Sequence, residues 1–328
     1  MKRRAFCKTT AAFTCSLPFL GAFAAKYPES LEKDIHRFQL GSFTCTVFKD
    51  LMWKYKAKDY FINAEEEDLS QSLLRYKIDP ENIPSPFIAI LLQDGQRNIL
   101  VDTGSGYLEE PLVFRGNEFM VRGELAQLLA AEGVDRRDIT DVILTHFHLD
   151  HIGGVYSDKA ELNYPNARYH VGEKEWDFWH SSRSEEQPPL FTHYVEKNVT
   201  PLKDQHLNFV RGDFAEIVPG ITAVDAGGHT PGQLALIINQ GQKGNELLYV
   251  SDAFLHPLHV ERTDWRTNYD YDHEAAQRSR TKLLNLAHEE GMLVNAFHFD
   301  FPGMGRIDKV NGRWKWSYQT EQVLRGRG

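Results

Sequence analysis

The chain reads Thr-His-Phe-His-Leu-Asp-His at residues 145–151. Imidazole and carboxylate groups are the ligands that zinc and its neighbouring divalent metals prefer in proteins. Because alternate residues of an extended segment point to the same side, we expect His146 and His148 to bind one ion. Asp150 and His151 lie just past the expected bend and would face a second ion. The stretch therefore predicts a metal site for two ions.

The residues on either side of this motif support a strand that ends in a functional loop. The apolar run Val-Ile-Leu precedes the motif at 142–144, and Gly153 and Gly154 follow it. The simpler alternative is a chance cluster of solvent-exposed histidines, since the chain has 14 of them. That alternative does not account for the strand-then-loop context, so we interpret the stretch as a metal site.

Three later segments each place one more candidate ligand after a strand-like run. They read Gly-Gly-His at 227–229, Ser-Asp at 251–252 and Phe-His at 297–298, and they supply His229, Asp252 and His298. Each is weak alone, because a single His after a strand is more often a surface or core side chain than a ligand. Asp102 similarly either bonds its own turn or supports a ligating imidazole.

The remaining sequence alternates between strand and helix patterns, which favours an α/β fold. We predict a helix start near Asn63, a loop at 79–86, a hairpin turn at Asp94-Gly95, and an insertion or lid at 156–204. The predicted strands are 38–48, 88–92, 98–101, 141–144, 292–297, two short pieces around Asn311-Gly312, and four successive strands of a second sheet at 208–210, 221–223, 235–238 and 246–250. Further helices are expected from Leu125 to Gly133 and from Asp272 to Glu290.

The first residues are expected to be a leader rather than part of the fold. A basic head with paired arginines at 3–4 is followed by an apolar stretch at 11–23 and a small-residue site at Ala24. This pattern is typical of a twin-arginine signal peptide, so residues 1–24 would be removed and residues 25–328 would form a single domain. A membrane anchor needs about 20 apolar residues, and Pro18 interrupts this shorter run. We expect a bacterial protein that is periplasmic or secreted, with no stable membrane insertion of the mature chain.

The charge balance argues against nucleic-acid partners. The formal net charge of −9 becomes −13 when the four basic residues of the leader are removed. A strongly acidic surface repels phosphate backbones. Two of the three cysteines lie in the leader, so Cys45 can form no internal disulfide and is expected to be a core residue on a strand.

The order of these segments resembles the metallo-β-lactamase-fold hydrolases over nearly the whole chain after the leader. The resemblance implies an αββα sandwich of two mixed sheets flanked by helices, and it assigns Asp102 to ligand support. It implies catalytic roles for Asp150 and Asp252. The implied metal ligands are His146, His148 and His229 for one ion, Asp150, His151 and His298 for the other, and Asp252 between them.

The implied activity is hydrolysis of a small molecule by two divalent metal ions. Metal coordination lowers the pKa of a water from about 15.7 toward neutrality, and a metal-bridging hydroxide would then attack an ester-type bond, whether phosphotriester, aryl ester or lactone. Asp150 would also take or return a proton. Zn²⁺ is the expected ion, with Mn²⁺ or Fe²⁺ as alternatives, and a homodimer is left open.

Two related branches and one other class of enzyme stay open. The sequence at 297–305 and the leader are similar to the methyl parathion hydrolase group, which we favour. N-acyl homoserine lactonases are the alternative; they carry a Tyr three positions after the bridging Asp, where this chain has Leu255. A mononuclear iron oxidoreductase resembling persulfide dioxygenases is the further alternative.

Other residues near the motifs receive minor roles. His256 and His259 are expected to have surface or hydrogen-bonding roles rather than to bind metal. The aromatic residues expected to line an apolar pocket are Trp176, Phe178, Trp179, Phe254 and Trp265.

Overall fold

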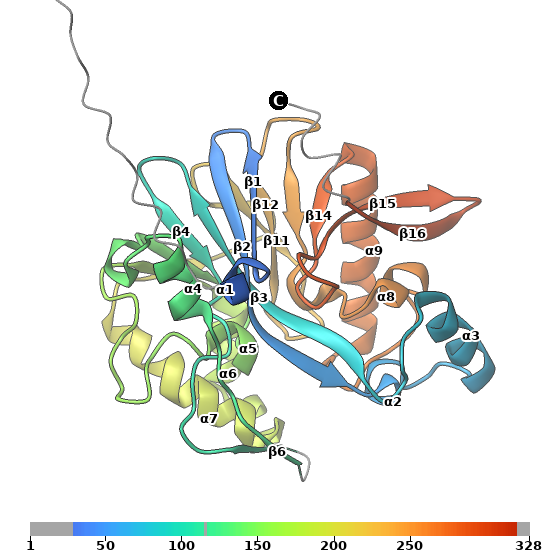
Figure 1. The fold of residues 1–328 in the computed structure, drawn as a ribbon, viewed down its shortest axis with the longest axis horizontal. Helices are drawn as coiled ribbons and strands as arrows, with labels where there is room; N and C mark the ends of the chain where they lie inside the picture. Colours follow the sequence, from blue (N-terminus) through green and yellow to red (C-terminus); the bar gives the residue numbers. More distant parts are fainter. Residues whose placement is uncertain (1–28, 115–116, 320–328) are drawn as a thin grey trace, which may run out of the picture.

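The computed structural model describes residues 29–114 and 117–319, whose strands form two seven-stranded sheets and a separate two-stranded hairpin (Figure 1). The first large sheet has the strand order β1-β2-β3-β4-β7-β8-β9. Its first four strands pair antiparallel, and β4, β7, β8 and β9 run parallel. The bounds are Ile35–Leu40 (β1), Phe43–Tyr55 (β2), Ile83–Gln93 (β3), Asn98–Val101 (β4), Asp141–Leu144 (β7), Arg168–Gly172 (β8) and Leu207–Val210 (β9).

The second large sheet has its strands in sequence order, from β10 to β16. Only the β13–β14 pairing among them is parallel within the described residues. The bounds are Ala215–Val218 (β10), Ile221–Asp225 (β11), Leu234–Ile238 (β12), Leu247–Tyr249 (β13), Leu293–Asn295 (β14), Met304–Val310 (β15) and Arg313–Tyr318 (β16). The separate hairpin consists of Leu112–Phe114 (β5) and Asn117–Phe119 (β6).

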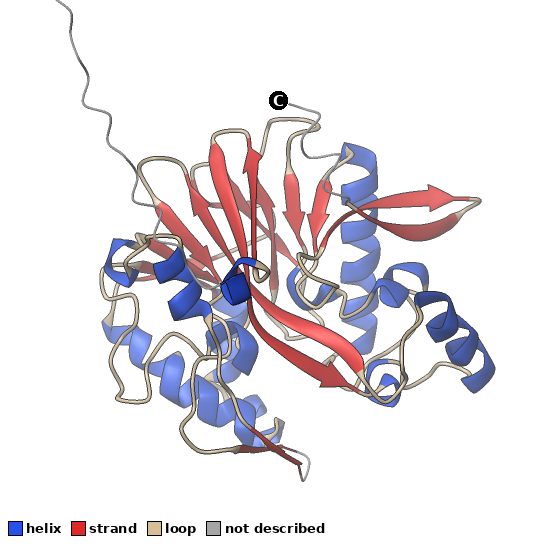
Figure 2. Ribbon diagram, viewed as in Figure 1, coloured by secondary structure: helices blue, strands red, loops and turns tan. Residues whose placement is uncertain are grey.

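Helices cover the outer faces of the two sheets (Figures 1 and 2). One apolar cluster joins the first sheet to α4, α6 and α7, and another joins the second sheet to α9. A third cluster lies between the sheets and brings Val47 and Ile90 of the first together with Leu236 of the second. The predicted αββα sandwich of two mixed sheets is therefore confirmed.

The helices are mostly short. Their bounds are Glu29–Glu32 (α1), Ala57–Tyr60 (α2), Glu66–Tyr76 (α3), Leu125–Ala131 (α4), Leu149–Ile152 (α5), Glu173–Trp179 (α6), Pro189–Asn198 (α7), Pro257–Glu261 (α8) and His273–Glu290 (α9). Short 3₁₀ segments span Arg136–Asp138 (η1), Ser182–Glu186 (η2), Thr200–Asp204 (η3) and Ser251–Ala253 (η4).

Local sequence signals account for the elements that were predicted best. All four residues of β7 are buried, as expected for an apolar parallel strand covered on both faces. Helix α9 begins where the Asp272 side chain accepts hydrogen bonds from two backbone N–H groups, and it ends at Gly291, which has φ +64°. Cys45 is a buried core residue on β2, as predicted, and burial raises the pKa of its thiol to about 12.

Three predictions in the first third of the chain differ from the structure. Residues 38–48 are not one strand, because a turn at Gly41 separates β1 from β2. Of the loop predicted from the prolines at 79–86, residues 79–82 do form a loop, but residues 83–86 are the start of β3. There β3 pairs only with β2, so Pro84 and Pro86 need no N–H on the other side. The helix predicted to start near Asn63 begins at Glu66, and its N-cap residue is Glu65.

Two predictions in the middle of the chain are also wrong. The segment 156–204 is not an insertion, because it contains β8, which pairs parallel with β7 inside the first sheet. The first of the four strands assigned to the second sheet is β9, which is the edge strand of the first sheet. Strand pairing depends on contacts distant in sequence, which hydrophobic patterns do not show.

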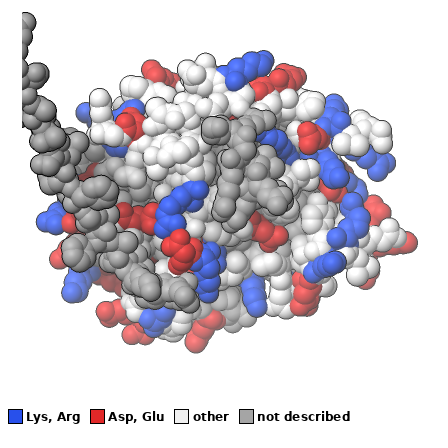
Figure 3. Space-filling view, turned by 45° about the horizontal axis from the view of Figure 1, so that its top comes forward, with Lys and Arg blue, Asp and Glu red and all other residues white. Residues whose placement is uncertain are grey.

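No helix in the described ranges combines the length and apolar character needed to cross a membrane. The predicted signal peptide at 1–24 lies outside the described residues and stays a prediction. On the face drawn in Figure 3, basic and acidic side chains are interspersed among the described residues.

Gly153 and Gly154 are required because two loops meet there. A Cβ atom on Gly154 would lie 2.1 Å from the carbonyl oxygen of Thr103, and one on Gly153 would lie 2.1 Å from that of Ser105. The hydroxyl of Thr103 also donates to the carbonyl of His151 at 2.8 Å. The glycines therefore let the histidine-rich loop pack directly on the loop that carries Asp102.

We expect Gly154→Ala to lower the free energy of unfolding by about 3 kcal/mol, because a methyl group there forces the two backbones apart. Gly95→Ala is the control. It has φ +84° and nothing within 4 Å of an added Cβ, so we expect it to lose only about 1 kcal/mol from backbone strain. Denaturant unfolding of both variants measures the difference; equal losses would show that the loop contact is not tight.

Candidate metal centre

Four of the seven candidate ligands follow the end of strand β7. His146 and His148 lie in the segment after Leu144, and His148 is the N-cap residue of α5. Asp150 and His151 lie within α5 itself. All four side chains are buried, and His146 and His151 are completely so. The bend predicted after the strand is therefore the start of a short helix.

The other three candidate ligands come from loops of the second sheet. His229 lies between β11 and β12, Asp252 lies in η4 after β13, and His298 follows β14. Each is at most 4% exposed. The structure thus brings all seven predicted side chains together from loops of both sheets.

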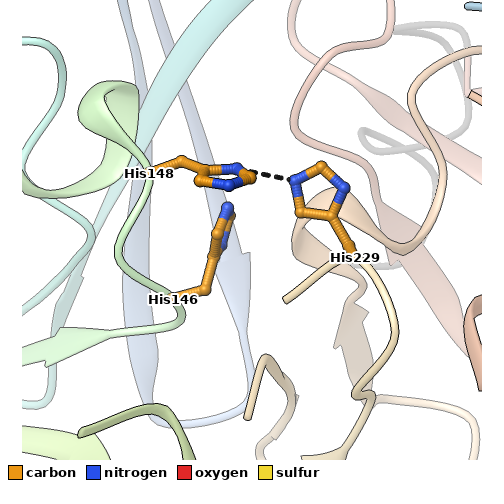
Figure 4. Close-up of side chains that lie close together, drawn as sticks. All are labelled: His146, His148 and His229. Carbon is orange, nitrogen blue, oxygen red and sulfur yellow. Dashed lines mark hydrogen bonds between the residues drawn. The ribbon is translucent and has the colours of Figure 1, made fainter. Parts of the chain in front are cut away.

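His146, His148 and His229 form the first ligand group (Figure 4). One potential ligand atom from each lies within 4.8 Å of the others. Nε2 of His229 is 2.9 Å from Nδ1 of His148, and the ring of His146 points toward this pair. An all-imidazole set of this kind suits zinc and similar ions.

Asp150, His151, Asp252 and His298 form the second group, with ligand atoms again within 4.8 Å. Nε2 of His298 lies 3.0 Å from Oδ2 of Asp252 and 3.5 Å from Oδ2 of Asp150. Oδ2 of Asp252 is also 3.4 Å from Nε2 of His229 in the first group. Asp252 therefore lies between the two groups.

Burial and neighbouring charges shift the pKa values of three candidate ligands, His146, His148 and His151. Burial lowers the pKa of His146 and His148 well below the ordinary value, so both keep a free lone pair at neutral pH. Burial also lowers the pKa of His151, but the carboxylates of Asp102, Asp252 and Asp150 outweigh it and raise that pKa well above its usual range. The space in front of His151 therefore favours a cation.

The donor set fits two divalent ions. Nε2 of His146, Nε2 of His151 and Oδ1 of Asp252 are buried and make no hydrogen bond of good geometry among the described residues, although the last two lie 3.2 Å apart. A buried polar atom left unpaired costs about 1–3 kcal/mol, and a cation in each group would satisfy these three atoms. Nitrogen and oxygen donors together suit zinc, manganese and iron.

Asp102 supports a ligand, as the resemblance implied. Its Oδ2 lies 2.8 Å from Nδ1 of His151, and it also accepts hydrogen bonds from the Tyr249 hydroxyl and the backbone N–H of Thr145. The contact fixes the His151 ring so that Nε2 faces the second group. Asp102 has φ +57°, a left-handed conformation that Asp tolerates better than most residues.

Glu175 is a supporting residue that sequence reasoning missed. It is completely buried, and its carboxylate accepts hydrogen bonds from the backbone N–H groups of Phe147 and Gly232. It therefore ties the His146–His148 loop to the loop of His229. Glu175 lies in the first turn of α6 after another glutamate, a pattern that normally indicates an exposed helix start.

Two other ligands also have partners that the sequence did not reveal. The hydroxyl of Ser85 lies 2.9 Å from Nδ1 of His298, and the carboxylate of Asp270 lies 3.3 Å from Nδ1 of His229. Neither residue belongs to a motif, and both are far from their partners in sequence, so no local signal points to them.

Both ligand groups border the same cavity. Its walls are largely aromatic and aliphatic, which is typical of small-molecule sites. The residues that line it are Leu51, Trp53, Tyr55, Tyr60, Phe87, Leu112, Val121, His148, Leu149, Asp150, Leu190, Phe191, His229, Asp252, Leu255, Tyr269 and His298.

The five aromatic residues predicted to line the pocket are not among its lining residues. Phe178 and Trp179 instead pack in the core between the first sheet and its helices, and Phe254 packs beside α9. Surface roles for His256 and His259 are also wrong, because both are buried. Their hydrogen-bonding roles are confirmed: Nδ1 of His256 accepts from the N–H of Leu258, and Nε2 of His259 lies 3.0 Å from a backbone carbonyl.

Comparison with known proteins gives a family and several relatives. The family model of the Metallo-beta-lactamase superfamily matches residues 89–290. An N-acyl homoserine lactonase from Bacillus sp is 27% identical over 252 residues, which cover 72% of this chain and 91% of that protein. The N-acyl homoserine lactonase of Bacillus cereus is 25% identical over 257 residues, with the same two coverages.

Solved structures share the fold. The hydrolase AbOPH of the beta lactamase superfamily superposes with a TM-score of 0.77 at 21% identity, over 88% of this chain and 98% of that one. AidC, a dizinc quorum-quenching lactonase, gives a TM-score of 0.74 at 23% identity, over 87% and 97%.

We expect Asp252→Asn to reduce bound metal and to lower activity at least 100-fold, because the charge between the two ligand groups is lost. The control is His256→Asn, four positions later, where asparagine can still cap α8. Elemental analysis and turnover of both variants test this. Full metal content in Asp252→Asn, or the loss of an equivalent in His256→Asn, would show that the ligand assignment is wrong.

Proposed function

Because the chain belongs to the metallo-beta-lactamase superfamily and is a metal-dependent hydrolase, we propose that it uses two divalent ions to cleave ester-type bonds in neutral, apolar small molecules. The observation that carries this proposal is the position of Asp252 between two complete ligand groups at the wall of an apolar cavity.

The proposed division of ligands follows the two groups. His146, His148 and His229 would hold one ion, Asp150, His151 and His298 the other, and Asp252 would contact both. When bound, the two ions would supply Lewis acidity, which activates a water near neutral pH and stabilises negative charge on the substrate oxygen. Zn²⁺ is the ion we propose, with support from the dizinc AidC.

Asp150 is proposed to move the proton. Its Oδ2 faces His298 and His151, at 3.5 and 3.9 Å. Its other oxygen would then take a proton from the attacking water and return it to the oxygen of the leaving group. Asp150 also lines the cavity, so a bound ester lies within reach of it.

The cavity wall supports a neutral substrate. None of the described residues that line it is lysine or arginine. Apart from the two ions, an anionic substrate would therefore meet no cationic side chain, and a charged group placed against the apolar wall would be buried without compensation. Six of the lining residues are Trp, Tyr or Phe, which provide flat surfaces for an acyl chain or an aryl group.

N-acyl homoserine lactonase activity is the second candidate, because curated relatives with that name match over 91% of their length. A lactone is a cyclic ester and fits the same chemistry. Against it, the position three residues after Asp252 is Leu255, which lines the cavity without a hydroxyl group. The relatives give no support to the iron oxidoreductase alternative.

We expect protein reconstituted with two equivalents of Zn²⁺ to hydrolyse p-nitrophenyl butyrate and not p-nitrophenyl phosphate, which has the same leaving group but a charged phosphoryl group in place of the neutral acyl group. Removal of metal by a chelator should abolish turnover, and Zn²⁺ should restore it. An aryl phosphotriester and N-hexanoyl homoserine lactone, assayed in parallel, separate the two branches. One iron per chain with oxygen consumption, or turnover without metal, would contradict the proposal.

We expect Trp53→Ala to raise KM for the aryl ester about tenfold with little change in kcat, because a cavity wall is lost while the ligand groups stay in place. Trp314→Ala is the control. Trp314 packs beside the α9 core and does not line the cavity, so its loss should leave KM unchanged. An unchanged KM in Trp53→Ala would place the substrate elsewhere.

A further inference from the structure

Arg280 of helix α9 is buried and contacts both the loop of Asp252 and the segment before α9 that holds Asp270. Only 1% of its side chain is exposed. Its Nε donates to the carbonyl of Ala253 at 2.7 Å, and one terminal nitrogen donates to Oδ2 of Asp270 at 2.7 Å. The other terminal nitrogen donates to the carbonyl of Trp265 at 3.1 Å. All three bonds form inside the protein.

Two of these contacts lead directly to a candidate ligand. Ala253 directly follows Asp252 in η4. Asp270 places Oδ1 at 3.3 Å from Nδ1 of His229. The guanidinium of Arg280 is therefore linked to the Asp252 loop through a backbone carbonyl and to His229 through the Asp270 carboxylate.

The contact with Asp270 orients the His229 ring. When Nδ1 of His229 carries the proton and donates it to Asp270, Nε2 keeps its lone pair. That Nε2 atom lies 2.9 Å from Nδ1 of His148 and 3.4 Å from Oδ2 of Asp252, at the centre of the ligand cluster. Because the Asp270 side chain is fully buried, water does not compete for the bond.

The location of this ion pair argues for a role beyond holding the fold together. Removing an aspartate and an arginine from water is expensive, and apolar residues of similar volume often stabilise a core as well or better. A buried pair that touches two ligand-bearing loops, however, sets the distance between His229 and Asp252. An apolar pair would leave both loops free to shift.

We propose that Asp270 and Arg280 are positioning residues that hold His229 and Asp252 at the separation needed for metal binding. The inference rests on the proposed function, since it requires the seven side chains to bind metal. Asp270 acts on the three-histidine group alone, whereas Arg280 acts on both groups through the Asp252 loop. The second group has its own support, because Ser85 contacts Nδ1 of His298.

The matched control is Asp141, which makes another buried Asp–His contact away from the ligands. Oδ1 of Asp141 lies 2.8 Å from Nε2 of His170, and Asp141 is at the start of β7, whereas the ligands follow its end. Asp141→Asn therefore removes the same kind of contact without touching a ligand loop.

The experiment titrates metal-free full-length protein with Zn²⁺ in competition with a chromophoric chelator. Residues that hydrogen-bond a metal ligand typically contribute 10- to 100-fold to metal affinity. We expect Asp270→Asn to weaken one of two Zn²⁺ equivalents by that factor, Ser85→Ala to weaken the other, and Asp141→Asn to weaken neither. Spectra of Co²⁺-substituted protein assign each loss, because the all-nitrogen group and the mixed nitrogen–oxygen group differ in ligand field.

Arg280→Lys covers the case in which Asp270→Asn folds poorly. Lysine keeps the positive charge but lacks the planar guanidinium that bonds Ala253 and Asp270 at the same time. We therefore expect weaker binding of both Zn²⁺ equivalents. If Asp270→Asn and Arg280→Lys bind Zn²⁺ as tightly as Asp141→Asn does, the positioning role is refuted while the proposed function stands. If the unaltered protein binds no Zn²⁺, the proposed function itself fails.

Discussion

The structure depends on the burial of two carboxylates, Asp150 and Asp252, side by side among imidazoles and away from water. Uncompensated charge at such a place is strongly unfavourable, so the surroundings must either neutralise it or bind cations. The protein surrounds the carboxylates with histidines, of which His146 and His148 are kept neutral by burial. Two sheets are needed because no single strand end supplies seven ligands. The sandwich serves to bring four loops to one point, and the aliphatic core between the sheets fixes the distance between those loops.

Sequence reasoning found the parts of this centre that are encoded locally. The segment from His146 to His151 could be read because its ligands are close together, and His229, Asp252 and His298 could be added because a familiar order of segments connects them. The supporting residues could not be found this way. Glu175 resembles an exposed helix start, and Ser85 lies in a segment whose prolines suggested a loop. Their roles come from contacts across 57 positions, from Glu175 to Gly232, and across 213 positions, from Ser85 to His298.

The same distinction explains the errors in the fold. Elements with strong local signals, such as β7, α9 and the turn at Asp94-Gly95, are where they were predicted. The errors in the middle of the chain concern which strands pair. Strand β8 was assigned to an insertion, and β9 to the wrong sheet, because parallel pairing leaves no turn signal between neighbouring strands. The pocket aromatics failed for a similar reason: Trp53, Phe87 and Tyr269 reach the cavity from segments distant from the metal motifs.

The wall of the cavity that contains Phe191 is joined to the metal centre. The ring of Phe191, on α7, is stacked on the ring of His148 with centroids 4.5 Å apart. A replacement of Phe191 that reshapes the cavity also removes the ring that holds the imidazole of His148 in place. A substitution at this wall that admits new substrates is therefore expected to weaken metal binding as well. The β5–β6 hairpin contributes Leu112 to the cavity from outside both large sheets, and its described residues make no ring contact with a histidine of the metal centre. Divergence of specificity in an enzyme built this way is therefore expected to proceed through the hairpin first, with the α7 wall changing least.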